Sequence, residues 1–172
     1  MAFGIVADSV QAIRRILTDD REELLGQLQR IEGKVEMTLR VVWDVPNVFE
    51  YFIRTHPELR LLRDRLFLAG REPTEEEKIE LGRLFERTLH EDRAAGARVV
   101  RDVLAPLCAE LHQNSPRTER EVMNLACLVE RAAQARFEEG VFAAAALFDD
   151  NYSFDYSGPW PPYSFVDVVL KI

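Results

Sequence analysis

The chain has 172 residues, of which 47% are hydrophobic and 30% charged, and its formal net charge is −8. This length suits one domain with its own hydrophobic core, which we expect to span residues 1–172. The negative charge repels phosphate backbones and anionic lipids, so it argues against nucleic acid and lipid membranes as partners. The sequence shows neither an apolar run of the roughly 20 residues that a membrane span needs nor a signal peptide at its start.

The first part of the chain predicts two strands separated by helical segments. Residues 2–6 are a short strand candidate, and Asp8 or Ser9 can cap the helix that follows. Apolar residues then recur at helical spacing as far as Gly33, a typical helix stop. Residues 34–43 alternate apolar and polar side chains, which predicts a strand with one buried face. The helical apolar face comprises Val10, Ile13, Ile16, Leu17, Leu24, Leu25, Leu28 and Ile31. The buried strand face comprises Val35, Met37, Leu39, Val41 and Trp43.

The middle of the chain, from about residue 45 to 113, predicts helices. Thr74 and Glu77 have the spacing of a capping box, and a long helical pattern follows them to about His112. Pro106 should kink or locally break this helix. We expect the long helix to pair with the helix before it as an antiparallel hairpin that resembles a short coiled coil and projects from the sheet as an arm.

The last part of the chain predicts two more strands around a helix. Residues 121–130 are a strand candidate with Met123, Leu125, Cys127 and Val129 on its inner face. Residues 132–148 follow a helical pattern, and residues 151–157 alternate aromatic and small polar side chains. If the middle segment is set aside, the predicted elements follow the order strand, helix, strand and then strand, helix, strand again. We therefore predict an α+β fold: a ferredoxin-like four-stranded antiparallel sheet with helices on one face and residues 45–113 inserted as a helical hairpin.

The residues that usually carry catalysis or bind metals are not arranged for either task. His56, His90 and His112 share no metal-site spacing with other ligands. Cys108 and Cys127 stand far apart in apolar segments, which indicates reduced, buried thiols rather than a disulfide framework. No glycine-rich phosphate loop or nucleophile motif occurs, and the clustered carboxylates suit solvated helix ends. We expect no catalytic residue, no cofactor and no metal, and hence a protein that is not an enzyme.

Two segments are candidates for binding a partner. The run Gly158-Pro159-Trp160-Pro161-Pro162-Tyr163-Ser164-Phe165 is stiff because proline fixes its own backbone and restricts the residue before it. Trp160, Tyr163 and Phe165 could lock the structure, with Trp160 closing an edge of the core, or could anchor a partner. The helical arm could pack only on itself, or could present Arg83 and Arg87 to a partner helix, although both arginines could instead form ion pairs along their own helix.

Three segments of the sequence resemble one protein family. Residues 151–157 followed by the proline-rich run resemble the C-terminal end of the gas vesicle protein F/L family (GvpF/GvpL). Phe3-Gly4-Ile5-Val6 resembles the opening of that family's C-terminal half, and Gly33-Lys34-Val35-Glu36 with the five residues after it resembles one of its strands. The three segments keep the family's order from about residue 3 to about residue 168. Family members usually carry a further N-terminal domain, so the resemblance implies a short or a shortened member.

The resemblance implies a non-enzymatic role in building gas vesicles, the air-filled protein shells that make prokaryotic cells buoyant. Such an assembly, accessory or minor structural protein would lie in the cytoplasm or on the vesicle. Its partners would be the major, very hydrophobic shell protein and other accessory proteins. The alternative from another class is a ferredoxin-like module that binds a small ligand or regulates. A polar pocket between helices and sheet would favour that alternative, and a dry, packed interface would disfavour it.

Overall fold

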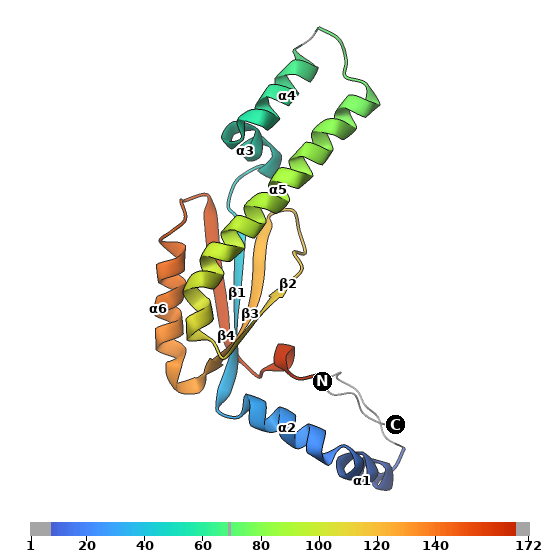
Figure 1. Cartoon of the computed structure of the whole chain (residues 1–172), viewed down its shortest axis with the longest axis vertical. Helices are drawn as coiled ribbons and strands as arrows, with labels where there is room; N and C mark the ends of the chain where they lie inside the picture. Colours follow the sequence, from blue (N-terminus) through green and yellow to red (C-terminus); the bar gives the residue numbers. More distant parts are fainter. Residues whose placement is uncertain (1–7, 69, 168–172) are drawn as a thin grey trace.

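The computed structural model describes residues 8–68 and 70–167, and its parts follow one another along a single long axis (Figure 1). A sheet with two helices on one face forms the middle of the molecule. A helical arm projects from one end of the sheet, and two short helices lie beyond the other end. The predicted strand at residues 2–6 lies outside the described residues.

The four strands form one antiparallel sheet in the order β2-β3-β1-β4. The strands are β1 (Lys34–Trp43), β2 (Glu110–Asn114), β3 (Glu121–Glu130) and β4 (Tyr152–Trp160). Helix α5 (Glu75–Leu104) connects β1 to β2, and helix α6 (Gln134–Ala145) connects β3 to β4. Both helices cover the same face of the sheet (Figure 1). This arrangement confirms the predicted α+β, ferredoxin-like class.

The segments that form the first and second strands of this fold differ from the prediction. Residues 34–43 form the first strand of the ferredoxin-like unit rather than the second. The second strand is β2, which the sequence pattern assigned to the end of the long helix. Pro106 explains the difference, because α5 ends at Leu104 and the short 3-10 helix η1 (Ala105–Leu107) turns the chain into β2. A proline inside a helix removes a backbone hydrogen bond, and here it ends the helix instead of kinking it.

The core lies between the sheet and the helices. The predicted inner face of β1 is confirmed, since all five of its apolar side chains are at most 5% exposed. The inner face of β3 is confirmed in the same way. Helices α5 and α6 complete the layer with Val100, Leu104, Phe137, Val141 and Ala144, which are also buried. Helix α6 follows the short 3-10 helix η2 (Arg131–Ala133).

The arm consists of α3 (Val48–Thr55), α4 (Pro57–Phe67) and the first half of α5 (Figure 1). Asn47 caps α3, and Thr74 and Glu77 form the predicted capping box at the start of α5. The base of the arm is aromatic: Phe52 lies edge-on to Trp43 at a ring-centroid distance of 5.2 Å and to Phe85 at 5.6 Å. These contacts join the arm to the first strand of the sheet.

Helices α1 (Val10–Asp19) and α2 (Arg21–Ile31) lie at the opposite end (Figure 1). Ser9 caps α1, and Gly33, with a φ of 72°, follows the end of α2. The apolar face predicted for these helices is present, but neither helix contains a buried residue. Ile31 at the end of α2 is partly buried against the small cluster of Ala126, Leu128 and Phe165. None of the helices in residues 8–68 and 70–167 combines the length and the apolar character that crossing a bilayer requires.

Candidate protein-binding surfaces

The proline-rich run begins inside the sheet. The sequence predicted that the last strand ends at residue 157, before the prolines. In the structure, β4 continues through Gly158 and Pro159 to Trp160, which pairs with Glu36 of β1. The pairing shifts register at this point, and Gly158 has a φ of 135°. A Cβ atom on Gly158 would lie 2.7 Å from the Met37 Sδ and 2.9 Å from the Glu36 carbonyl oxygen. Glycine is therefore needed here both for its backbone conformation and for the close approach of the two strands.

The aromatic side chains of the run separate into one buried and two exposed rings. Trp160 is 51% exposed and Tyr163 is 52% exposed, whereas Phe165 in the 3-10 helix η3 (Tyr163–Phe165) is 2% exposed. The expectation that Trp160 closes an edge of the core is therefore wrong. The chain turns after Trp160, so that Phe165 and not Trp160 packs onto Ala126 and Leu128 on the outer face of β3. The exposed indole donates a hydrogen bond to the Ser157 Oγ at 3.3 Å.

A buried carboxylate holds this run against the sheet. Glu36 is 7% exposed and accepts hydrogen bonds from the Ser164 backbone N–H at 2.8 Å and from the Ser164 hydroxyl at 2.7 Å. The alternation in β1 predicted that Glu36 points to solvent on the outer face. It does lie on that face, but the C-terminal run covers it. No local sequence signal could reveal this pairing, because the two residues meet only through the fold.

A second surface consists of apolar side chains on α1 and α2, which we call the apolar stripe. Its members are 38 to 65% exposed: Val10, Ile13, Leu17, Leu25 and Leu28. The stripe lies at the same end of the molecule as the run, since Ile31 at the end of α2 packs beside Phe165. Arg30 strengthens this connection through a two-pronged ion pair with Glu110 of β2, in which its Nε lies 2.7 Å from the Glu110 Oε1. The sequence identified these residues as one apolar helical face, and the structure shows that this face is exposed.

The basic residues proposed on the arm have different surroundings. Arg83 is exposed and borders two surface cavities of about 790 and 630 Å³ that flank α5 and share Ile79 as a further lining residue. Arg87 lies 3.9 Å from Glu91, one helical turn further along, so it forms the local ion pair that the sequence also allowed. Arg83 and Arg87 lie in the first half of α5, on the arm, whereas Tyr163 and Phe165 lie in η3 at the opposite end of the sheet (Figure 1).

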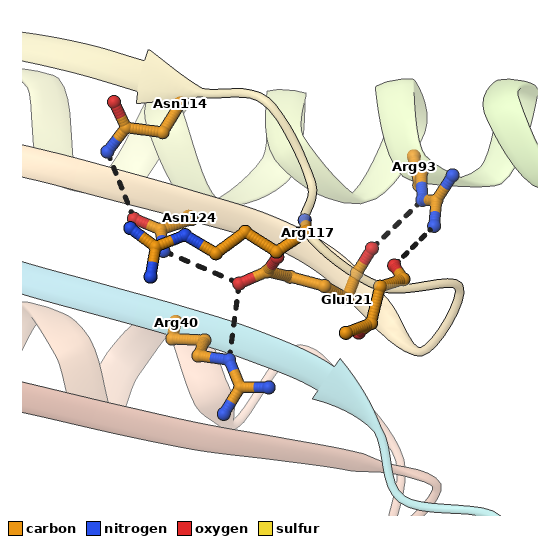
Figure 2. Close-up of polar contacts among 7 residues, drawn as sticks. Arg40, Arg93, Asn114, Arg117, Glu121 and Asn124 are labelled. Carbon is orange, nitrogen blue, oxygen red and sulfur yellow. Dashed lines mark hydrogen bonds and ion pairs between the residues drawn. The ribbon is translucent and has the colours of Figure 1, made fainter.

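The direction of the arm is fixed by an arginine that the sequence analysis did not single out. Arg93 of α5 donates hydrogen bonds to the backbone carbonyls of Thr118, Glu119 and Glu121, at 2.9 to 3.1 Å. The bond to Glu121 is drawn in Figure 2. Its guanidinium also lies 5.6 Å from the centre of the Trp43 ring. Burial lowers the pKa of Arg93 from its ordinary value. One side chain therefore connects the long helix, the β2–β3 loop and β1.

The carboxylate of Glu121 completes this junction. Its side chain is 1% exposed and accepts hydrogen bonds from the Arg117 backbone N–H at 2.5 Å, the Arg40 Nε at 3.2 Å and the Asn124 Nδ2 at 3.4 Å (Figure 2). Burial alone would raise the pKa of Glu121, but these hydrogen bonds and the charge of Arg40 lower it below its ordinary value. The group is thus ionised at neutral pH and structural, because its oxygens are used within the fold.

Within residues 8–68 and 70–167, no three His, Cys, Asp or Glu side chains gather closely enough to hold a metal ion. The candidate binding features of the described chain are instead the apolar stripe, the exposed pair Trp160 and Tyr163, and the Arg83 region of the arm. All three are surfaces rather than enclosed sites, and exposed apolar surface such as the stripe is typical of proteins that bind other proteins.

Comparison with known proteins identifies the class. The sequence profile of the family described as gas vesicle synthesis protein GvpL/GvpF matches residues 1–167, and the chain belongs to this family. It is 27% identical to gas vesicle protein F of Dolichospermum flosaquae over 169 residues, which are 98% of this chain and 68% of that protein. It is 28% identical to gas vesicle protein F of a Streptomyces species, with 97% and 69% of the two chains covered.

The fold agrees with a solved member of the same family. The crystal structure of the gas vesicle protein GvpF from an Anabaena species superposes with a TM-score of 0.85 at 25% sequence identity, covering 98% of this chain and 69% of that one. The chain thus spans about two thirds of these relatives. The resemblance inferred from the three sequence segments is confirmed, and the chain has a role related to gas vesicles.

Proposed function

We propose that this chain is a non-enzymatic assembly, accessory or minor structural protein of gas vesicles that binds the hydrophobic shell protein in the cytoplasm. Membership of the gas vesicle F/L family supports the general role. The single observation that supports binding of an apolar client is the exposed stripe on α1 and α2, which the fold of the described residues leaves uncovered.

The physical argument rests on what a shell protein requires before it polymerises. A small protein with a large apolar face aggregates unless that face is covered. The apolar stripe offers a matching surface at the end of the molecule where Trp160 and Tyr163 are also exposed. Aromatic side chains with a polar tip are suited to the centre of such interfaces. The net charge of −8 keeps the complex dispersed and disfavours nucleic acid and anionic lipid as competing partners.

The alternative of a ligand-binding or regulatory module has less support. Side chains fill the layer between the helices and the sheet: Leu39, Val100 and Leu125 are 0% exposed. The cavities of about 790 and 630 Å³ lie elsewhere, the first between α5 and the β2–β3 loop and the second between α4 and α5. A tightly packed helix–sheet layer of this kind disfavours a small-ligand pocket at that place.

The proposal is tested by co-expressing the chain with the major gas vesicle shell protein and recovering the complex by pull-down. A stripe variant carries Ile13→Gln, Leu17→Gln and Leu28→Gln, and a second variant carries Trp160→Ala and Tyr163→Ala. The matched control carries Leu61→Gln and Leu147→Gln, which are 69% and 62% exposed at other places on the surface. We expect the stripe variant to lose most of the bound shell protein and the control to keep it.

A third variant, Arg83→Ala with Arg87→Ala, separates the arm from the stripe. If this variant loses the shell protein while the stripe variant keeps it, the contact lies on the arm. If the unmodified chain recovers no shell protein, the proposed binding is wrong for this chain, although its membership of the family stands. Circular dichroism of every variant shows that a loss of binding does not arise from unfolding.

A further inference from the structure

The arm carries a groove between α4 and α5 that combines apolar surface with charges of both signs. The groove corresponds to the cavity of about 630 Å³. Its apolar lining consists of Leu62 and Leu84, which are partly buried, and Ile79, which is 51% exposed. Its remaining lining residues are charged: Glu58, Glu76, Glu80, Arg83 and Arg87. A mixture of this kind is typical of contacts between separately folded proteins.

Four of these charges, which we call the charge row, lie on one face of α5: Glu76, Glu80, Arg83 and Arg87. They are separated by four, three and four residues, the spacing that places side chains on one side of a helix. All four are exposed. The row is about 16 Å long, since each residue adds about 1.5 Å along the helix. The acids lie nearer the tip of the arm, and the arginines lie nearer the sheet (Figure 1).

The charge row is poorly paired within one chain. Its two glutamates are like charges one helical turn apart, and so are its two arginines, an arrangement that destabilises an isolated helix. Glu80 lies 3.8 Å from Arg65, and Arg87 lies 3.9 Å from Glu91, and each of these side chains is at least 60% exposed. The other two charges of the row form no ion pair with any residue that the structure describes. Long, exposed ion pairs contribute little stability, so the row keeps its charges available for a partner.

The order of the charges is complementary to itself. If a second copy of α5 runs in the opposite direction along this face, Glu76 lies opposite Arg87 of the second copy, and Glu80 lies opposite its Arg83. Both pairs form in the same register because their residue numbers have the same midpoint. Two-fold symmetry repeats both pairs with the copies exchanged. A copy that runs in the same direction would instead place acid opposite acid and arginine opposite arginine.

We propose that two copies of the chain associate through the charge row, with the first halves of their α5 helices packed antiparallel. The charges set the direction and the register. Leu62, Ile79 and Leu84 beside the row supply the apolar burial that exposed ion pairs alone do not provide. A contact along one helix face about 16 Å long belongs to the small, transient class of interfaces, so the dimer forms at high protein concentration. It needs no shell protein, and its test is therefore independent of the proposed function.

Analytical ultracentrifugation of the full chain tests the proposal. In about 50 mM salt, and at protein concentrations up to about 1 mM, we expect an equilibrium between monomer and dimer. Because salt screens exposed charges, raising its concentration to about 0.5 M should weaken the dimer. A parallel pair, in which like charges face each other, would be strengthened by the same change.

Two double variants each leave the charge row with a single sign of charge. Arg83→Glu with Arg87→Glu gives an acidic row, and Glu76→Arg with Glu80→Arg gives a basic row. Each variant alone should associate with itself at least about tenfold more weakly than the unmodified chain, since every facing pair is then a pair of like charges. An equimolar mixture of the two should form a mixed dimer. The variant with all four substitutions should associate with itself again, because its reversed row is also self-complementary.

The matched control is Arg98→Glu with Arg101→Glu, which changes the net charge as the acidic row does, at exposed positions further along α5. It should dimerise nearly as well as the unmodified chain. The stripe variant should also dimerise, because the contact does not involve α1 and α2. Circular dichroism checks that every variant is folded.

Four results would overturn the proposal. They are an unmodified chain that stays monomeric at every concentration, a stripe variant that loses the dimer, a control that loses it as completely as the acidic-row variant, and a folded fourfold variant that does not recover it. If the fourfold variant fails to fold, the mixture of the two double variants decides, since the proposal requires them to form a mixed dimer.

Discussion

At the scale of single residues, burial distinguishes aromatic side chains that the sequence places side by side. Phe165 packs under the outer face of β3 and its ring lies 4.6 Å from that of His112, whereas Trp160 is half exposed. The sequence analysis considered Trp160 as the residue that closes the core, but Phe165 is the buried ring of the run. The assignment of roles within the run therefore rests on how the chain turns after Trp160.

This difference gives a prediction for two alanine variants. Phe165→Ala removes a fully buried ring and should lower the free energy of unfolding by about 3 to 5 kcal/mol. Trp160→Ala removes a side chain that is half exposed and should lower it by about 1 kcal/mol or less. Urea denaturation of both variants measures the effect. A Trp160→Ala variant as unstable as Phe165→Ala would contradict the roles assigned here.

The ionised Glu121 gives a prediction for the dependence of stability on pH. Its pKa is lowered in the folded chain, so the carboxylate adds stability at any pH above its unfolded pKa of about 4.3, and that contribution is lost as the pH falls through the folded pKa. Glu121→Gln should be about 1 to 3 kcal/mol less stable at pH 7 because the buried partners lose a charged acceptor. The difference from the unmodified chain, measured by urea titration, should shrink below about pH 4. A gap that stays constant down to pH 3 would show that the ionised form is not the stabilising one.

At the scale of elements, local patterns predicted the segments whose structure depends on neighbours in the sequence. The alternation in β1, the capping box of α5 and the inner face of β3 were all confirmed. Strand β2 was missed because Leu104, Leu107 and Leu111 continue a helical spacing through a segment without β-branched residues. Its strand conformation comes from pairing with β3, a tertiary contact that overrides local preference.

The candidate surfaces likewise divide into features that local sequence predicts and features that only the fold creates. The sequence identified the apolar residues of α1 and α2 and the aromatic residues of the run, because hydrophobicity and proline content are local properties. It did not identify Glu36 with Ser164, or Arg93 with the β2–β3 loop, because each pair forms only when segments distant in sequence meet. Whether an apolar face is covered is likewise a property of the whole fold.

The close approach of β4 to β1 at Gly158 gives a prediction at this scale. Gly158→Ala should lower the free energy of unfolding by about 1 to 3 kcal/mol, because alanine disfavours a φ of 135° and its Cβ would meet the Glu36 carbonyl oxygen and Met37. Gly82→Ala, at an exposed interior position in the first third of α5, is the matched control. Nothing lies within 4 Å of its added Cβ, so it should raise stability by about 0.5 to 1 kcal/mol. Thermal melting compares the two, and a neutral Gly158→Ala would refute the constraint on β4.

At the scale of the whole molecule, the parts extend along one axis rather than around a centre (Figure 1). The sheet and its two helices contain most of the buried side chains, while α4 and the start of α5 carry exposed apolar residues such as Leu61, Phe67 and Ile79. The arm keeps its direction because Arg93 and the aromatic contacts of Phe52 join it to the sheet.

An elongated shape is measurable in solution. A compact protein of this length has a radius of gyration of about 16 Å. Small-angle X-ray scattering of the chain should give a clearly larger value and an asymmetric distance distribution with a long tail. A near-spherical profile at about 16 Å would contradict the projecting arm.

Arg93 and the Phe52 contacts also determine what the two ends of the molecule can do together. Because Arg93 and Phe52 join the arm to the sheet, and Arg30 and Ile31 join α2 to its other end, the fold sets the distance between the arm and the apolar stripe. A partner bound at the stripe leaves the arm tip open, and a second partner would be placed at a fixed spacing from the first. For two joined binding sites, a rigid spacer raises the effective concentration of the second partner only when that spacing matches the target. The chain would then act as a rigid spacer between two bound partners.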